Sequence, residues 1–142
     1  MGNHANRGMD LEKTITHKLF PLYEQLNIFC LKIEVKQANG VYLNKSPFDF
    51  IVYHDNRMSA FDTKNCNDPK GMAISNFKLH QVKALSCVEA QGGLAFFLVY
   101  FSTIGQLELI PVSEMRDIIA SGAKKVTPDK RRKTGLDFLK IL

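Results

Sequence analysis

An Asp-x-Lys triplet with a second acid upstream is the group of side chains in this sequence best suited to chemistry. The acids are Asp49 and Asp62, and Lys64 supplies an ammonium group. Two carboxylates that converge beside an ammonium can hold a hard divalent cation and stabilise a developing negative charge. This combination indicates a metal-dependent phosphodiesterase.

The stretch that carries these residues is predicted to be a β-hairpin. Two apolar runs, at 48–53 and 58–64, flank an Asp-Asn pair at 55–56, which is typical of a tight turn. Because side chains alternate faces along a strand, Asp62 and Lys64 are expected to project to the same side. The upstream acid lies early on the partner strand, and we expect it to reach the same end of the hairpin.

The acid-x-Lys pattern is short, and three stretches of the sequence match it: 34–36, 62–64 and 68–70. Such a pattern recurs by chance. Pro69 cannot donate to a strand ladder, so the third stretch is interpreted as a loop. The first runs into an Asn-Gly hairpin signal at 39–40 and is interpreted as the solvated face of a strand. Only 62–64 follows an apolar strand with an acid upstream.

The composition is typical of an ordinary globular protein. The 142 residues, 45% of them apolar and 23% charged, fit one domain with a substantial core. The longest apolar run, 94–101, is much shorter than a membrane-spanning helix and favours a buried strand. We expect no secretory signal and no membrane partner. Cys30, Cys66 and Cys87 lack a Cys-x-x-Cys spacing, which favours reduced thiols and a cytoplasmic location.

The net charge of +5 is concentrated near the C-terminal end of the sequence. Six basic residues lie in one short stretch: Lys124, Lys125, Lys130, Arg131, Arg132 and Lys133. Asp129 is the single acid among them, so the rest of the sequence is nearly neutral. A concentrated basic patch suits a polyanion, because neutralised phosphates release counterions. On these residues alone, a solvated tail and a nuclear-localisation signal are equally open interpretations.

An amphipathic helix is predicted to begin near Asp10. Its apolar positions recur every three or four residues, at Leu11, Ile15, Leu19 and Leu22. Pro21 is expected to kink this helix or to start a separate turn. Glu12 lies in the first turn, where an acid favours the helix dipole.

A second helix is predicted from Ser75 or Asn76 to Ala90, with Gln81 as a polar member of its apolar side. The sequence also predicts strands at 28–35, 41–43, 94–101 and 106–111, a loop at 65–74, a short helix capped by Ser113 and running through Ala120, and a last strand or docking turn at 136–141. This order predicts a mixed α/β sheet with helices on its faces.

Four segments, in order, resemble the RecU family of Holliday-junction resolvases. They are Asn6-Arg7-Gly8-Met9 with Leu11-Glu12, then Asp49 separated by twelve residues from Asp62-Thr63-Lys64, then 74–81, then 90–93. The resemblance implies a restriction-endonuclease-like fold, a mixed β-sheet core flanked by helices. It also implies a single nuclease domain over 1–142, with a flexible arm at 1–8 and a basic C-terminal segment at 124–142.

The same resemblance implies a metal-dependent, structure-specific DNA endonuclease. It would resolve four-way junctions as a homodimer with Mg²⁺ or Mn²⁺, in the cytoplasm of a bacterial or phage-infected cell. The residues implied for catalysis are Glu12, Asp49, Asp62, Lys64 and Gln81. Those implied for the cation are Glu12, Asp49, Asp62 and the carbonyl of Thr63. Those implied for DNA are Arg7, Ser75, Asn76, Lys124, Lys125, Lys130, Arg131, Arg132 and Lys133.

Two departures from the RecU pattern leave alternatives open. The second acid of that motif is commonly Glu, whereas this chain has Asp62. The interval 28–47 is also too short for the long stalk that projects from RecU proteins before the first catalytic acid. The alternatives are a nuclease of the same class without junction preference and a catalytically inert DNA-binding module.

Overall fold

A five-stranded sheet lies at the centre of the computed structural model, which describes residues 10–34, 37–38, 41–42 and 46–135. The strands, in spatial order, are β1 (Phe29–Lys32), β4 (Phe50–His54), β5 (Arg57–Cys66), β7 (Leu94–Phe101) and β8 (Gln106–Pro111). Neighbours are antiparallel except β5 and β7, which are parallel. Two short antiparallel ribbons accompany the sheet: β2 (Gln37–Ala38) with β3 (Val41–Tyr42), and β6 (Met72–Ala73) with β9 (Lys125–Val126).

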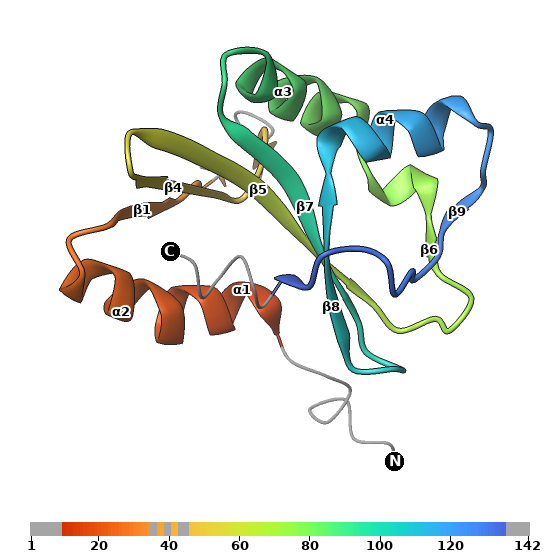
Figure 1. Cartoon of the computed structure of the whole chain (residues 1–142), viewed down its shortest axis with the longest axis horizontal. Helices are drawn as coiled ribbons and strands as arrows, with labels where there is room; N and C mark the ends of the chain where they lie inside the picture. The colour runs from red at the N-terminus through yellow and green to blue at the C-terminus, as the bar shows by residue number, and fades with distance from the viewer. Residues whose placement is uncertain (1–9, 35–36, 39–40, 43–45, 136–142) are drawn as a thin grey trace.

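Helices cover both faces of this sheet (Figure 1). On one face lies a continuous helical segment made of α1 (Leu11–Thr14), the π-helix η2 (Ile15–Leu19) and α2 (Phe20–Gln25). On the other lie α3 (Leu79–Ala90) and α4 (Val112–Ala120). The expected mixed α/β class is therefore confirmed, as is the hairpin predicted around 55–56. The hairpin predicted around 39–40 is formed by the two-residue strands β2 and β3, whereas the strand predicted at 28–35 is β1, which ends at Lys32 and pairs with β4 instead.

The π-helix η2 corrects the predicted pattern of the first helix. Pro21 stands in the first turn of α2, where a helix tolerates a residue without an N–H, so a new helical element starts beside it, as one of the two predicted alternatives has it. The wider π turn also shifts the apolar stripe by one residue. As a result Leu22, expected inside, is 55% exposed, and Tyr23 is buried in its place.

The sheet separates two apolar clusters, and strand alternation decides which residue joins which. Phe61 and Phe96 stack at 5.0 Å between ring centroids on the side of α1 and α2. The next residue of β7, Phe97, packs on the opposite side with α3 and α4. Strand β7 is therefore buried on both faces, as its continuous apolar run predicts. Asp62, which follows Phe61, is placed on the α3 side by the same alternation.

Other predicted element boundaries are wrong as well. The loop expected at 65–74 is shorter, because β5 extends through Cys66 and 72–73 form β6. Helix α3 begins later than expected: a 3₁₀ turn, η3 (Ile74–Asn76), precedes an extended Phe77, whose ring packs edge-on against the core. Helix α4 begins at Val112, and Ser113 does not cap it.

The basic stretch at 124–133 is docked on the body of the protein. Strand β9 pairs with β6, and its Val126 is buried in the core. Further on, the Leu109 N–H of β8 donates to the carbonyl of Lys133 at 3.0 Å. These contacts exclude a freely solvated tail for the described part of this segment.

Candidate active site

The hairpin of β4 and β5 has the geometry that its turn residues predict. Asp55 and Asn56 adopt φ values of 59° and 60°, the left-handed conformation that both positions of a tight two-residue hairpin turn require. The ladder then runs without interruption from His54 paired with Arg57 to Phe50 paired with Phe61. Locally favoured turn residues therefore fix the register that places the candidate site residues at the far end of the hairpin.

Asp62 and Lys64 lie side by side on the α3 face, as the alternation of β5 predicts. The Lys64 ammonium is 2.9 Å from Oδ2 of Asp62, whose side chain is almost fully buried. The same ammonium donates to Oε1 of Gln81 at 3.1 Å, which explains the polar residue on the apolar side of α3. Lys64 is thus held between a strand carboxylate and a helix amide.

Asp49 stands just before β4 and reaches across to β5. Its Oδ2 accepts hydrogen bonds from the Thr63 backbone N–H at 3.0 Å and from the Thr63 hydroxyl at 2.9 Å. Its charge is also close enough to Asp62 to act on that carboxyl. The structure therefore brings Asp49, Asp62 and Lys64 to one end of the hairpin.

The environment of Asp62 is unusual for a carboxyl group. Burial, and then the nearby charge and side-chain contact of Asp49, raise the pKa of Asp62 to about 7, against an opposing effect of Lys64. Its Oδ1 is buried and has no hydrogen-bond partner within the described residues. An unpaired buried carboxylate oxygen is costly, and a bound divalent cation would satisfy it. Because the cation must displace a proton, we expect its affinity to increase as the pH rises through 7.

Glu12, the third expected ligand, does not join these two acids. Its carboxylate forms an ion pair with Lys32 of β1 at 3.5 Å. Among the described residues, no group of three His, Cys, Asp or Glu side chains could hold a metal ion. The two hairpin acids are therefore the part of the expected ligand set that the structure assembles.

The competing acid-x-Lys stretch at 68–70 lies in a loop, as its proline predicts. Asp68 is exposed and pairs with Lys125 of β9 at 3.3 Å. The stretch at 34–36 lies largely outside the described residues. Of the three matches, 62–64 is the one with a buried acid beside its lysine.

Several expected DNA-contacting residues meet although they are distant in the sequence. The Ile74 N–H donates to the carbonyl of Lys124 at 3.0 Å, and Ala73 pairs with Lys125 across the β6–β9 ribbon. This places exposed Ser75 and Asn76 of η3 beside the first two basic residues of the segment. Phe77 follows η3 directly, and the centroid of its ring is 6.0 Å from the Lys64 ammonium.

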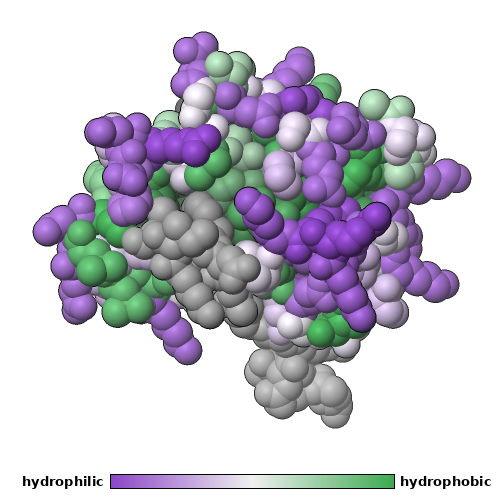
Figure 2. Space-filling view, viewed as in Figure 1, coloured by the Kyte–Doolittle hydropathy of each residue, from purple (hydrophilic) through white to green (hydrophobic). Residues whose placement is uncertain are grey.

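The remaining basic residues have different surroundings. Lys130, Arg131 and Lys133 are exposed, and hydrophilic side chains gather over the segment that follows β9 (Figure 2). Arg132 is different, because its side chain is only 9% exposed and pairs with Glu108 at 2.8 Å and Glu114 at 2.7 Å. Its charge is therefore paired with these two glutamates inside the protein. Arg7 and the stretch 136–141 lie outside the described residues.

Sequence reasoning missed two of these side chains. The Thr63 hydroxyl was not singled out, although a hydroxyl residue between the acid and the lysine of the motif was a usable signal. Glu108 was not noticed either, because nothing in its own β8 strand indicates that a distant arginine will pair with it.

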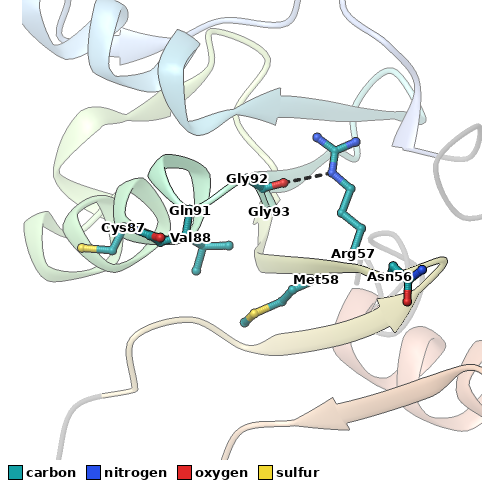
Figure 3. Close-up of a pocket in the computed structure, with 8 residues that line it drawn as sticks. All are labelled: Asn56, Arg57, Met58, Cys87, Val88, Gln91, Gly92 and Gly93. Carbon is teal, nitrogen blue, oxygen red and sulfur yellow. Dashed lines mark hydrogen bonds between the residues drawn. The ribbon is translucent and has the colours of Figure 1, made fainter.

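An open pocket of about 380 Å³ lies at the opposite, turn end of the hairpin, away from the acids (Figure 3). It is formed between the start of β5 and the end of α3, where Arg57 Nε donates to the Gly92 carbonyl at 3.1 Å. Met58 and Val88 supply its apolar lining. None of the candidate site residues described above lines this pocket.

The chain thus has a mixed sheet whose hairpin carries one acid and then an Asp-x-Lys triplet, the group of side chains expected of a metal-dependent phosphodiesterase. It belongs to the Recombination protein U (RecU) family, whose family model matches residues 6–139. The resemblance seen in the sequence is therefore confirmed.

Two named RecU relatives agree with this assignment. The chain is 28% identical to Holliday junction resolvase RecU of Streptococcus pyogenes serotype M1, over 92% of this chain and 74% of the relative. It is equally similar to the RecU of S. pyogenes serotype M5 strain Manfredo, of which 73% is covered. Among solved structures, it is similar to the Holliday junction resolvase Hjc of Archaeoglobus fulgidus, with a TM-score of 0.43 and 13% identity over 71% of this chain and 77% of that one.

In the described part of the chain, no helix has the length and apolarity to cross a membrane.

Proposed function

We propose that this chain is a DNA endonuclease that resolves Holliday junctions with Mg²⁺ or Mn²⁺ as a homodimer, in the cytoplasm where such DNA occurs. The two RecU relatives are named Holliday junction resolvases. The observation that carries the proposal is the buried, unpaired Oδ1 of Asp62, with Lys64 bound to the other oxygen of the same carboxylate. A buried anion with one free oxygen suits a cation site better than a purely structural ion pair.

Asp49 and Asp62 would hold the cation, and the Thr63 carbonyl is a further proposed ligand. Magnesium keeps several waters, so two carboxylates and a carbonyl are an adequate protein share. Glu12 is proposed to complete the site, for which it must leave Lys32. When bound, the cation supplies Lewis-acid activation of water and of the scissile phosphate.

Lys64 is proposed to offset the negative charge that develops on the phosphate during hydrolysis. Its contacts with Asp62 and Gln81 fix the ammonium before substrate arrives, so no reorganisation is needed at the moment of reaction. Gln81 is proposed to hold this lysine and the attacking water in place.

Around this centre, DNA phosphates are proposed to contact exposed polar and basic groups. These are Arg7, Ser75, Asn76, Lys124, Lys125, Lys130, Arg131 and Lys133. Because each neutralised phosphate releases counterions, junction binding is expected to weaken steeply as salt is raised. Arg132 is left out of this set, since its side chain is nearly buried between two glutamates.

The test is a comparison of three labelled DNAs: a synthetic four-way junction, a duplex of the same sequence, and its single strands. With Mg²⁺ we expect paired cuts in opposed strands of the junction, slower cleavage of the other two DNAs, and no cleavage in EDTA. Equal cleavage of all three would point to a nuclease without junction preference. Junction binding without cleavage in either Mg²⁺ or Mn²⁺ would favour an inert DNA-binding module.

The homodimer is proposed because two symmetric cuts need two active sites related by a two-fold axis. A candidate surface exists on the edge of the sheet. Phe29 and Leu31 of β1 and Tyr53 of β4 are exposed on one face, and Tyr53 pairs directly with Met58 of the pocket in Figure 3. Contiguous exposed apolar side chains of this kind are typical of association surfaces.

Sedimentation velocity of a Leu31→Lys variant tests this surface. A charge on each copy at the centre of an apolar contact is expected to shift the protein from dimer to monomer and to turn paired junction cuts into single nicks. Ile104→Lys, at an exposed apolar position in the β7–β8 turn, is the matched control and should stay dimeric. A dimeric Leu31→Lys variant would refute this choice of surface.

A further inference from the structure

The position of Asp49 depends on a feature of the hairpin that the acid-x-Lys motif does not contain. Strand β5 is longer than β4, and the ladder between them ends at Phe50 paired with Phe61. Beyond that point, the Asp49 N–H still donates to the Phe61 carbonyl at 3.2 Å. Alternate residues of a strand direct their backbone groups to the same edge, so the N–H of Thr63 also faces this edge, with no strand beside it.

The Asp49 carboxylate lies beside Thr63 of β5, at the position where a longer β4 would otherwise pair with it. Its Oδ2 accepts from the Thr63 N–H at 3.0 Å and from the Thr63 Oγ1 at 2.9 Å. Hydrogen bonds to an ionised acceptor are among the stronger ones in proteins, and two donors from one residue fix the position of this carboxylate oxygen. With Oδ2 occupied, the other oxygen of Asp49 is the one left for the site.

We propose that Thr63 is a positioning residue whose hydroxyl, together with its backbone N–H, fixes Asp49 as a ligand for the divalent cation. This inference rests on the proposed function and deepens it. It gives the middle residue of the acid-x-Lys triplet a role through its side chain, on the strand face opposite to Asp62 and Lys64. The hydroxyl is the part of this arrangement that other residue types at position 63 would not supply, because every non-proline residue has the N–H.

The measurement is the affinity of the protein for Mn²⁺, by titration calorimetry without DNA. Thr63→Val keeps the β-branched shape and the N–H but removes the hydroxyl donor. It is expected to weaken Mn²⁺ binding by about 10-fold or more and to slow junction cleavage at limiting Mn²⁺, the usual cost of losing a group that orients a metal ligand. Thr63→Ser retains the hydroxyl and is expected to restore most of the affinity.

A double-mutant cycle with Asp49→Asn separates positioning from a general structural effect. If Thr63 acts through Asp49, the Val substitution should cause little further loss of Mn²⁺ affinity once Asp49 is neutral. Additive losses would overturn the inference, as would equal Mn²⁺ affinities of wild type and Thr63→Val. Equal losses in the Val and Ser variants would also overturn it, since Ser keeps the hydroxyl and the loss could then not come from removing that group.

The failure of this inference is distinguishable from failure of the proposed function. A wild-type protein that cuts junctions while Thr63→Val binds Mn²⁺ normally would reject the role of Thr63 alone. A wild-type protein that binds Mn²⁺ but cuts no DNA would reject the nuclease, while the Mn²⁺ affinities would still decide the role of Thr63.

Discussion

Junction cleavage by an Asp62→Asn variant is expected to fall by about 10²–10³-fold or more, and Lys64→Ala should cause a loss of the same order. The amide of the first variant cannot balance a divalent cation, and the second removes the ammonium held at 2.9 Å from that carboxylate. Single-turnover cleavage of a labelled four-way junction in saturating Mg²⁺ measures both. Asp68→Asn, in the exposed acid-x-Lys stretch of the loop, is the matched control and should cut like wild type.

The lost activity of Asp62→Asn should not come from unfolding. Burial raises the pKa of Asp62 in the folded protein to about 7, above its value in the unfolded chain. The metal-free wild type therefore loses stability as the pH rises from about 4 through 7, and the asparagine variant lacks this loss. Urea unfolding in EDTA at pH 8 is expected to find the variant at least as stable as wild type. Wild-type cleavage rates in Asp62→Asn would show that Asp62 is not part of the active site.

Arg132→Met is expected to lower the free energy of unfolding by about 3–5 kcal/mol, because it leaves the buried Glu108 carboxylate without its cationic partner, with the Gln106 amide and the Asp129 N–H as its remaining donors. Glu108 is 1% exposed, and Arg132 Nη1 lies 2.8 Å from its Oε1. Urea denaturation at neutral pH measures the loss. Arg131→Met is the neighbouring control: that side chain is 91% exposed, and its solvent-screened pair with Asp129 should contribute little to stability.

A second variant identifies the cause of this loss. Replacing both partners, Arg132→Met with Glu108→Leu, removes the buried charge and should recover most of the stability. If the double variant is as unstable as Arg132→Met alone, the loss comes from side-chain packing of the arginine. If Arg132→Met unfolds like wild type, the ion pair does not hold the basic segment on the body.

The hairpin with its two acids and lysine could be predicted because its determinants are local. An Asp-Asn turn takes up the left-handed backbone at both positions, and the period of two along β5 then decides that Asp62 and Lys64 share a face. The same holds for β7, whose unbroken apolar run indicates a strand covered on both sides. Membership of the RecU family also followed from the order and spacing of a few short motifs.

Other features depend on partners distant in the sequence and could not be predicted from local patterns. The π-helix η2 shifts the apolar stripe and leaves Leu22 exposed, and α3 begins only after the buried, extended Phe77. The ribbon of β6 with β9 joins segments that no periodicity connects.

The sequence by itself determined the residue types of the site, the hairpin that carries them and the family, because turn preference, strand alternation and motif spacing act over short stretches of chain. Only the tertiary structure decided the state of those residues. Whether a carboxylate keeps a free oxygen, as Asp62 does, or whether an arginine is available to DNA, as Arg132 is not, depends on burial and on charges brought near by folding. A local sequence pattern contains neither the burial of a side chain nor its distance from a charge elsewhere in the chain.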